Sequence, residues 1–204
     1  MGARKLKDTA QKIYSVRMTL EEAEKFKNEW RRQNHRITAF WTAIEAAARG
    51  AILQRGRVFP VLPSEITLQA SAKTLKMRLP SGRCLYYHKP SVSATNGSLS
   101  YWGEEKGQWV ERRTWGGTLA ENATQACARD IMAEAMTRVA DRAGLAPIMT
   151  IHDELVYPAP SEALQPGVFA YLEKLVQQPP SWAGGLPIAG EVKLMSRYGV
   201  VSKV

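Results

Sequence analysis

The sequence is poor in the residues and segments that several classes of protein require. Its 204 residues include only two cysteines, Cys84 and Cys127, which are too few for a disulfide framework or a cysteine-rich zinc site. No apolar run approaches the roughly 20 residues of a transmembrane helix. The charged first ten residues lack the apolar stretch of a secretory signal. We therefore expect a reduced, cytoplasmic protein with no membrane partner.

Several common catalytic motifs are also missing. The sequence contains neither a phosphate-binding Gly-x-x-x-x-Gly-Lys-Ser/Thr loop nor a His-Glu-x-x-His pair. Its three histidines, His35, His88 and His152, are far apart in the sequence and have no cysteine-rich surroundings. This pattern disfavours a zinc enzyme or a nucleotide-binding enzyme of the phosphate-loop type.

Positive charge is present in excess, and it is unevenly distributed. The 28 Lys and Arg outnumber the 19 Asp and Glu, which leaves a net charge of +9. The first 60 residues carry 13 basic and 6 acidic residues, so most of the excess lies there. A positive surface attracts polyanions over roughly 8–10 Å, which makes nucleic acid the expected partner. The alternative is a solvated helix face that only improves solubility.

The first 50 residues show a helical pattern. Thr19 and Glu22 form a capping-box signature, and apolar residues follow at helical spacing. Asn34 and His35 interrupt this pattern, which then restarts and reaches Gly50, a plausible helix end. We therefore expect a helical hairpin. Four aromatic residues in it are expected to pack in a core rather than stack on bases: Phe26, Trp30, Phe40 and Trp41.

The pattern changes to short strands and turns between about residues 51 and 115. Leu75, Met77 and Leu79 alternate with charged residues, and Pro80-Ser81-Gly82 then indicates a turn. A second turn is indicated at Asn96-Gly97. These signals predict a β-rich meander.

Helices and strands then mix along the rest of the chain. A long helix is predicted from about 119 to 142, ended by Gly144, with Asn122 and Gln125 on a polar stripe. A helix from 162 to 178 and a strand around 188–194 are expected after it. The elements do not repeat as βαβ units, so the predicted fold class is α+β.

One dense polar cluster lies between two apolar segments. His152, Asp153 and Glu154 separate residues 147–151 from residues 155–158, which predicts a β-hairpin or a sharp bend with an acidic tip. Neighbouring carboxylates between buried strands repel each other and are costly to desolvate unless a partner neutralises them. Mg²⁺ is one such partner, since it prefers carboxylate and phosphate oxygens. A solvated turn is the alternative.

At this point the sequence resembles family A DNA polymerases, which are like DNA polymerase I, and especially their phage branch. Residues 114–130 (TWGGTLAENATQACARD) are similar to the palm helix of that family, and residues 151–156 (IHDELV) to its motif C. Residues 79–87 are also similar to the phage members, and residues 1–4 resemble the stretch that follows motif B. The resemblance implies a palm, an antiparallel sheet packed on helices. Residues 1–50 would then be a helical remnant of the fingers, and residues 51–204 the palm with a β-rich insertion at about 55–115.

The resemblance also implies roles for five residues. Asp153 corresponds to the motif C aspartate that binds catalytic Mg²⁺, and Glu154 to the neighbouring acid near the primer terminus. His152 corresponds to the motif C histidine beside the primer strand. Gln125 corresponds to a palm glutamine that contacts the DNA minor groove, and Asn122 is the nearest match to the family's asparagine, one residue out of place.

The sequence contains no counterpart of motifs A and B. The family's two-metal chemistry needs carboxylates from both motifs A and C, so two Mg²⁺ ions would be shared with another polypeptide. The resemblance therefore implies a C-terminal subunit or fragment of a DNA-directed DNA polymerase, inactive alone. Its partners would be primer–template DNA, dNTP and an N-terminal polymerase half carrying motifs A and B, in the cytoplasm of a bacterial or phage-infected cell. The alternatives are a non-catalytic nucleic-acid-binding module derived from a polymerase and a protein-binding scaffold.

Overall fold

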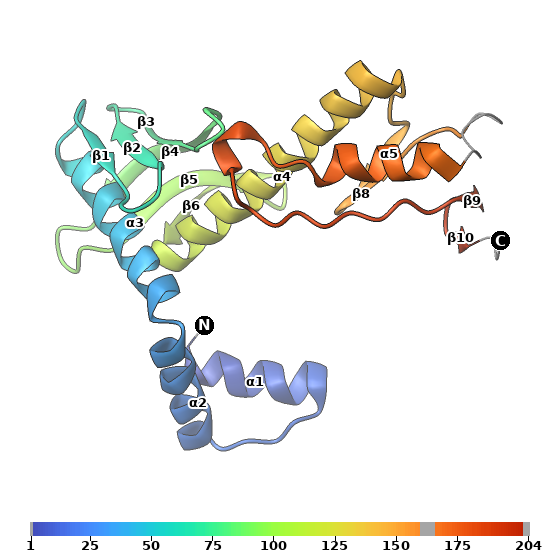
Figure 1. Cartoon of the computed structure of the whole chain (residues 1–204). Coiled ribbons are helices and arrows are strands. Elements are labelled where there is room, and N and C mark those ends of the chain that lie inside the picture. The colour runs from blue at the N-terminus through green and yellow to red at the C-terminus, as the bar shows by residue number, and fades with distance from the viewer. Residues whose placement is uncertain (1, 160–165, 202–204) are drawn as a thin grey trace. The chain divides into compact units, whose positions relative to one another are not determined.

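The computed structural model describes residues 2–159 and 166–201 (Figure 1). The described residues form two compact units. The described residues of the first unit are 2–79 and 84–122, and those of the second unit are 80–83, 123–159 and 166–201. Within the described part of the chain, no helix combines the length and the apolar character needed to cross a bilayer.

The first unit begins with three helices. They are α1 (Ala3–Tyr14), α2 (Leu20–Gln33) and α3 (His35–Leu53), and α1 packs against α2. The capping box before α2 is confirmed. The hydroxyl of Thr19 accepts a hydrogen bond from the backbone N–H of Glu22 at 3.1 Å, and the Glu22 carboxylate accepts one from the backbone N–H of Thr19 at 2.7 Å.

The predicted hairpin between α2 and α3 is wrong, because only Asn34 separates the two helices. The backbone N–H of Asn34 donates to the carbonyl of Trp30, and that of Thr38 donates to the carbonyl of Asn34. Helical hydrogen bonding therefore continues through the junction, and the chain has no loop in which to reverse direction.

Gly50 does not end α3, which continues to Leu53. The ring of Phe59 lies directly over Gly50, and a Cβ atom at this position would lie 2.6 Å from the ring. Glycine is therefore required here for close packing on the first strand rather than for a helix end.

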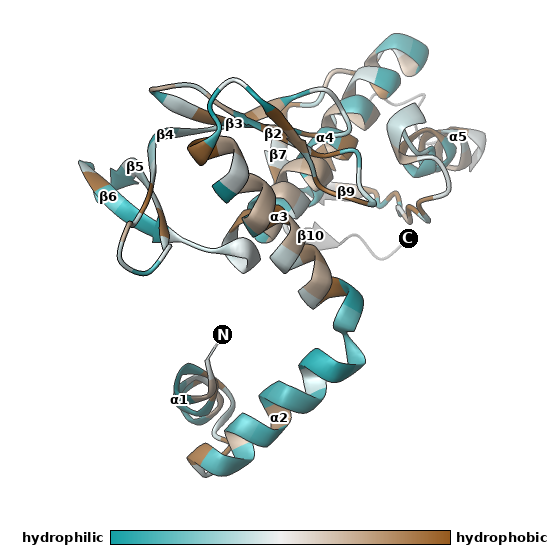
Figure 2. Ribbon diagram, turned by 90° about the vertical axis from the view of Figure 1, so that its left-hand side faces the viewer, coloured by the Kyte–Doolittle hydropathy of each residue, from teal (hydrophilic) through white to brown (hydrophobic). Residues whose placement is uncertain are grey.

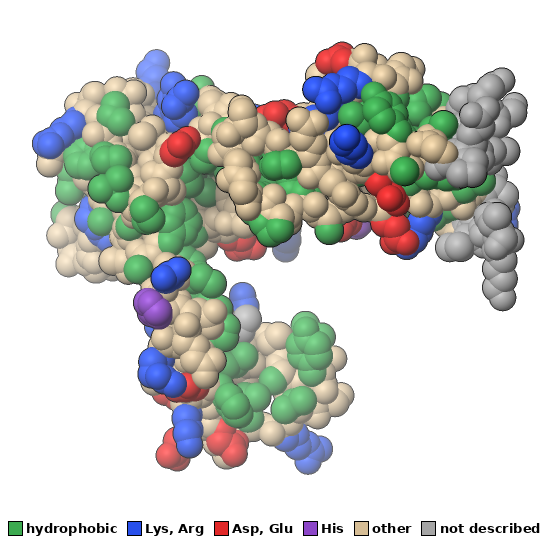
Figure 3. Space-filling model, viewed as in Figure 1, with side chains coloured by type: hydrophobic (Ala, Val, Ile, Leu, Met, Phe, Trp, Pro, Cys, Tyr) green, Lys and Arg blue, Asp and Glu red, His purple; other side chains and the backbone are tan. Residues whose placement is uncertain are grey.

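The core-packing prediction for the four N-terminal aromatic residues is wrong for two of them. Phe26 and Trp30 are exposed, whereas Phe40 and Trp41 are half-buried. The ring of Trp30 stacks on that of Trp41, with centroids 5.8 Å apart. Figure 3 shows Lys and Arg side chains over α2 beside exposed hydrophobic ones. Without the expected hairpin, the apolar side of α2 is only partly covered.

The predicted meander is confirmed as a six-stranded antiparallel sheet in which each strand pairs with the next one in sequence. The chain order therefore places β1 and β6 at the two edges of the sheet. The strands are β1 (Val58–Pro60), β2 (Thr67–Ala70), β3 (Thr74–Arg78), β4 (Cys84–Val92), β5 (Leu99–Glu105) and β6 (Gln108–Thr114).

The core of the first unit lies between this sheet and α3. Leu75 and Met77, two of the alternating residues, are buried on the face that α3 covers. Ile44 and Ala48 of α3 are fully buried. Figure 2 shows the contrast between the two neighbouring helices, since α2 is mostly hydrophilic and α3 mostly hydrophobic. Burial of one apolar face per element therefore explains this arrangement.

The long helix α4 (Gly116–Ala143) is confirmed and begins three residues earlier than predicted. Its first residue lies against α3. The backbone N–H of Gly116 donates to the Glu45 carboxylate at 2.7 Å, and a Cβ atom on Gly116 would lie only 1.9 Å from the carbonyl oxygen of Trp41. Gly144, with φ of +65°, ends the helix as expected.

The second unit contains two small hairpins and a helix. They are β7 (Met149–Ile151) with β8 (Glu154–Val156), β9 (Met195–Arg197) with β10 (Val200–Val201), and α5 (Pro166–Gln177). The predicted helix is thus confirmed over 166–177, while residues 162–165 lie outside the described residues. A short 3₁₀ helix covers Ser181–Ala183. The mixture of helices with antiparallel strands confirms the α+β class.

The predicted strand at 188–194 is wrong, because this segment is irregular. Side chains of α5 bind its backbone in place of a neighbouring strand. The Gln177 amide donates to the carbonyl of Gly190 at 2.7 Å, and the Glu173 carboxylate accepts from the N–H of Val192 at 3.1 Å. These contacts satisfy backbone groups that a sheet would otherwise pair.

Candidate active site

The acidic tip is a tight two-residue turn between β7 and β8. Ile151 pairs with Glu154, so only His152 and Asp153 form the loop, while Glu154 begins the returning strand. His152 has φ of +51°, in the left-handed region, and Asp153 does not. A positive φ at only the first loop residue fits a type II′ turn. A residue other than glycine is strained at this first loop position, and such strain often occurs at functional sites.

The tip is open to solvent. His152, Asp153 and Glu154 are all exposed, and so are Ile148 and Met149 before them. The expectation that two buried strands flank the carboxylates is therefore wrong. Water screens the repulsion between the two acids, so their closeness alone does not require a metal. The solvated turn that the sequence left open describes this geometry better.

Glu154 is held by a tyrosine that the sequence pattern did not single out. The hydroxyl of Tyr198 donates a hydrogen bond of 2.6 Å to the Glu154 carboxylate. Tyr198 lies with Gly199, which has φ of +83°, in the turn between β9 and β10. The bond to Glu154 raises the pKa of Tyr198 above its usual value. Gly199 permits a turn at this position, but nothing in the local sequence indicates the distant partner of Tyr198.

Asp153 differs from Glu154 in its surroundings. Among the described residues it has neither a hydrogen-bond partner nor an ion pair, and it is exposed. The oxygen donors of Asp153 and Glu154 suit Mg²⁺, which proteins often bind through one or two carboxylates plus phosphate oxygens and water. Over residues 2–159 and 166–201, no group of three His, Cys, Asp or Glu side chains gathers to hold a metal. The tip therefore offers at most part of a metal site.

The two predicted minor-groove residues lie on α4. Gln125 is exposed. Asn122 is half-buried, and its amide donates a 3.1 Å hydrogen bond to the hydroxyl of Tyr87. Tyr87 is itself in the core, where burial raises its pKa. Asn122 thus supports the packing of α4 on the sheet, while the DNA contacts of both residues stay predictions.

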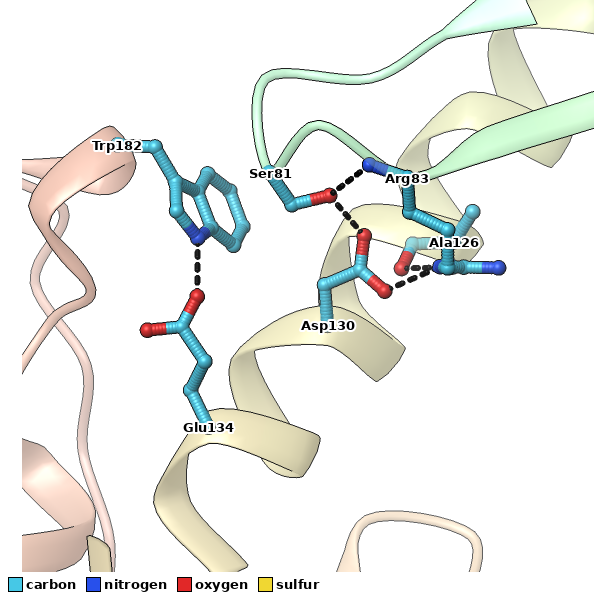
Figure 4. A network of polar contacts seen from close by, with 6 residues as sticks. All are labelled: Ser81, Arg83, Ala126, Asp130, Glu134 and Trp182. Carbon is cyan, nitrogen blue, oxygen red and sulfur yellow. Dashed lines mark hydrogen bonds and ion pairs between the residues drawn. The ribbon is translucent and has the colours of Figure 1, made fainter. Parts of the chain in front are cut away.

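A polar cluster ties the turn after β3 to α4 (Figure 4). The guanidinium of Arg83 donates to the Asp130 carboxylate and, at 2.8 Å, to the carbonyl of Ala126. The hydroxyl of Ser81 donates to the other oxygen of Asp130, which is only 7% exposed. One turn further along α4, Glu134 accepts a hydrogen bond from the indole of Trp182. Two of the segments that carry the family resemblance therefore meet in space, although 47 residues separate Arg83 from Asp130.

Comparison with known proteins relates the chain to a phage enzyme. Over 184 residues it is 35% identical to the DNA polymerase of Bacillus phage SP02. The aligned part covers 87% of this chain and 28% of that polymerase. No family model matches the sequence, and no solved structure matches it. The similarity supports a relationship to DNA polymerases, and the chain spans less than a third of the length of this relative.

Proposed function

We propose that the chain is the C-terminal, palm-bearing part of a family A DNA polymerase and adds dNTP to a primer 3′-hydroxyl together with a polypeptide that carries motifs A and B. The observation that supports this most is the 35% identity to a phage DNA polymerase along most of the chain. In this reading, residues 1–50 belong to the fingers and residues 51–204 to the palm. Such an enzyme would act in the cytoplasm of a bacterial or phage-infected cell.

Asp153 is the proposed metal ligand. Its carboxylate is exposed at the strained turn, where a second polypeptide can add an aspartate of its own. Asp153 would hold two Mg²⁺ ions together with the aspartate of the second polypeptide, and these ions would supply activation of the primer hydroxyl and stabilisation of charge on the transferred phosphate. Asp153 alone supplies only one of the required carboxylates, so this chain is proposed to be inactive by itself.

The neighbouring residues would position the primer–template DNA. Glu154, held by Tyr198, is proposed to lie near the primer terminus, and His152 beside the primer strand. Gln125, exposed on α4, is proposed to contact minor-groove acceptors that all base pairs share. Asn122 is proposed to contribute less to DNA binding, because its amide already donates a hydrogen bond to Tyr87.

A reconstitution experiment tests the shared site. This chain and a polypeptide with motifs A and B are purified separately and mixed with primer–template, dNTPs and Mg²⁺. Primer extension is expected only in the mixture, and chelation of Mg²⁺ should stop it. Extension by this chain alone would overturn the shared-site proposal. No extension in a mixture that forms a stable complex on DNA would overturn the catalytic assignment itself.

A second candidate function is non-catalytic nucleic-acid binding. It is favoured by the basic first 60 residues together with the incomplete acidic tip. In that case affinity for DNA should fall steeply with salt, and Asp153→Asn should change neither binding nor any activity of the assembled complex. The reconstitution experiment therefore separates the two functions.

A further inference from the structure

The face of the six-stranded sheet opposite α3 carries a row of aromatic rings. In the pairing register, His88 of β4 is opposite Trp102 of β5, and Glu104 of β5 is opposite Trp109 of β6. Opposed residues point to the same side, and residues two apart along a strand share a face. Four rings therefore lie on one face, which we call the aromatic face: Tyr86, His88, Trp102 and Trp109.

Three of the four rings are exposed to solvent, and that of Trp102 is half-buried. Tyr86 is 58% exposed and Trp109 is 51% exposed, whereas Leu75 and Leu99 on the other side are buried. The rings of His88 and Trp109 contact each other, with centroids 5.5 Å apart and tilted by 55°. Large exposed rings gathered on one surface are uncommon unless they bind something.

Positive side chains accompany the rings. The Nζ atom of Lys89 lies 4.9 Å from the ring centroid of Trp102, a cation–π contact. By the same register, three further cations lie on the aromatic face. Two acids, Glu104 and Glu111, lie there as well, and the Glu111 carboxylate accepts a hydrogen bond from the hydroxyl of Ser100. These cations are Lys76, Arg78 and Arg113. The face is thus aromatic and net positive, which complements a ligand that has both rings and negative charge.

We propose that the aromatic face binds single-stranded nucleic acid, with Tyr86 and Trp109 each stacking on a base. Exposed aromatic rings stack on unpaired bases of any sequence, while nearby cations neutralise the phosphates. Bases in a duplex are stacked on each other and are less available to the rings. This site goes beyond the proposed polymerase function, because it uses neither Asp153 nor a metal ion. An uncharged apolar protein surface would leave the cations without partners.

Binding of a fluorescently labelled 12-nucleotide oligo-dT to the full chain, measured by anisotropy without Mg²⁺ or dNTP, tests the proposal. Trp109→Ala and Tyr86→Ala are each expected to weaken binding about tenfold or more, the usual effect of losing one base stack. Trp109→Phe should retain most of the affinity, since a ring remains. Tyr171→Ala removes an exposed tyrosine from α5 and serves as the matched control, with no expected loss.

The salt dependence gives a second readout. Arg113→Gln should weaken binding and make the logarithmic salt slope shallower by about 0.7, the share of one phosphate contact on a single strand. A duplex of the same length should be much less sensitive to Trp109→Ala. Asp141→Asn, which changes an exposed acid on α4, should leave oligo-dT affinity unchanged. Because the assay contains neither Mg²⁺ nor dNTP, failure of the polymerase proposal and failure of this one give different results.

Three results would overturn the proposal: no oligo-dT binding by the wild-type chain, unchanged affinity in folded Trp109→Ala and Tyr86→Ala variants, or equal losses on single strand and duplex. Circular dichroism of each variant establishes that it is folded. If the face binds a protein instead, the aromatic variants will leave oligo-dT affinity unchanged, which is the second of these results.

Discussion

Two aspartates of the second unit show how differently the same side chain is used. Asp130 is buried on α4, and it accepts hydrogen bonds from both Ser81 and Arg83. Asp153 is exposed in a strained turn and has no such partner within the described residues. The first carboxylate is fully used by the fold, whereas the second is available to a ligand. The contrast separates a structural acid from a candidate catalytic acid more clearly than their sequence motifs do.

The substitution Asp153→Asn is expected to have the largest effect on primer extension. In the reconstituted polymerase, loss of a metal-binding carboxylate is expected to lower primer extension by more than about a hundredfold. The free energy of unfolding should change by less than about 0.5 kcal/mol, because the side chain is exposed. Primer extension and urea unfolding measure the two effects. Asp141→Asn, an exposed acid on α4, is the matched control with no expected effect on either. Normal extension by Asp153→Asn would remove the metal-ligand assignment.

Asp130→Ala is expected to show the opposite behaviour. It leaves Ser81 without its acceptor and Arg83 with the Ala126 carbonyl alone. Stability should fall by about 2 kcal/mol, since Arg83 is partly exposed. A double-mutant cycle with Arg83→Ala, followed by urea unfolding, measures the coupling between the two side chains. Additive losses would show that the ion pair contributes little to stability.

Tyr198→Phe tests whether the hydrogen bond to Glu154 positions the acidic tip. Removing this hydroxyl is expected to lower primer extension about two- to tenfold, with DNA affinity unchanged. A purely structural role would instead show as a lower unfolding midpoint without a change in rate. Glu154→Gln, which keeps an acceptor oxygen, should lose less extension than Glu154→Ala if positioning matters.

The same contact predicts a pH dependence. The bond to Glu154 raises the pKa of Tyr198 above its usual value of 10.0. A raised pKa in the folded state means that the contact is intact below about pH 10 and is lost as pH rises through the shifted value. The difference in absorbance titration at 295 nm between wild type and Tyr198→Phe measures this pKa. In Glu154→Ala it should return toward the usual value.

His152→Gly is expected to have the smallest effect. Glycine accepts φ of +51° without strain, so the turn should become more stable by about 0.5–1 kcal/mol. If His152 also contacts the primer strand, extension should fall despite the gain in stability, a trade-off common at strained functional positions. Thermal unfolding and primer extension separate the two effects. A loss of stability would show that the imidazole makes contacts that outweigh the strain.

Local signals in the sequence predicted most of the elements. Thr19 and Glu22 predicted the start of α2, the alternation at Leu75 and Met77 predicted the meander, and Gly144 predicted the end of α4. In each case the cause lies within a few residues of the effect. The turn at His152 was predicted for the same reason, since apolar residues on both sides indicate two strands.

The failures involve contacts that no local sequence pattern contains. Gly50 resembles a helix end, but it faces the ring of Phe59, and no local pattern indicates that contact. Tyr198 and Glu154 are 44 residues apart, so the pattern at the acidic tip does not include the tyrosine. Phe26 was expected in a core because the pattern shows which face of a helix is apolar, but not whether another element covers it.

The edge strand β6 has a consequence for self-association. Its sequence, QWVERRT, exposes one side of its backbone at the border of the sheet, where the N–H and C=O groups of another extended segment can add to it. Glu111, Arg112 and Arg113 place charge along this border and oppose such addition. Exchanging both arginines for valine would remove that protection, and concentrated solutions of the variant should then form fibrillar aggregates.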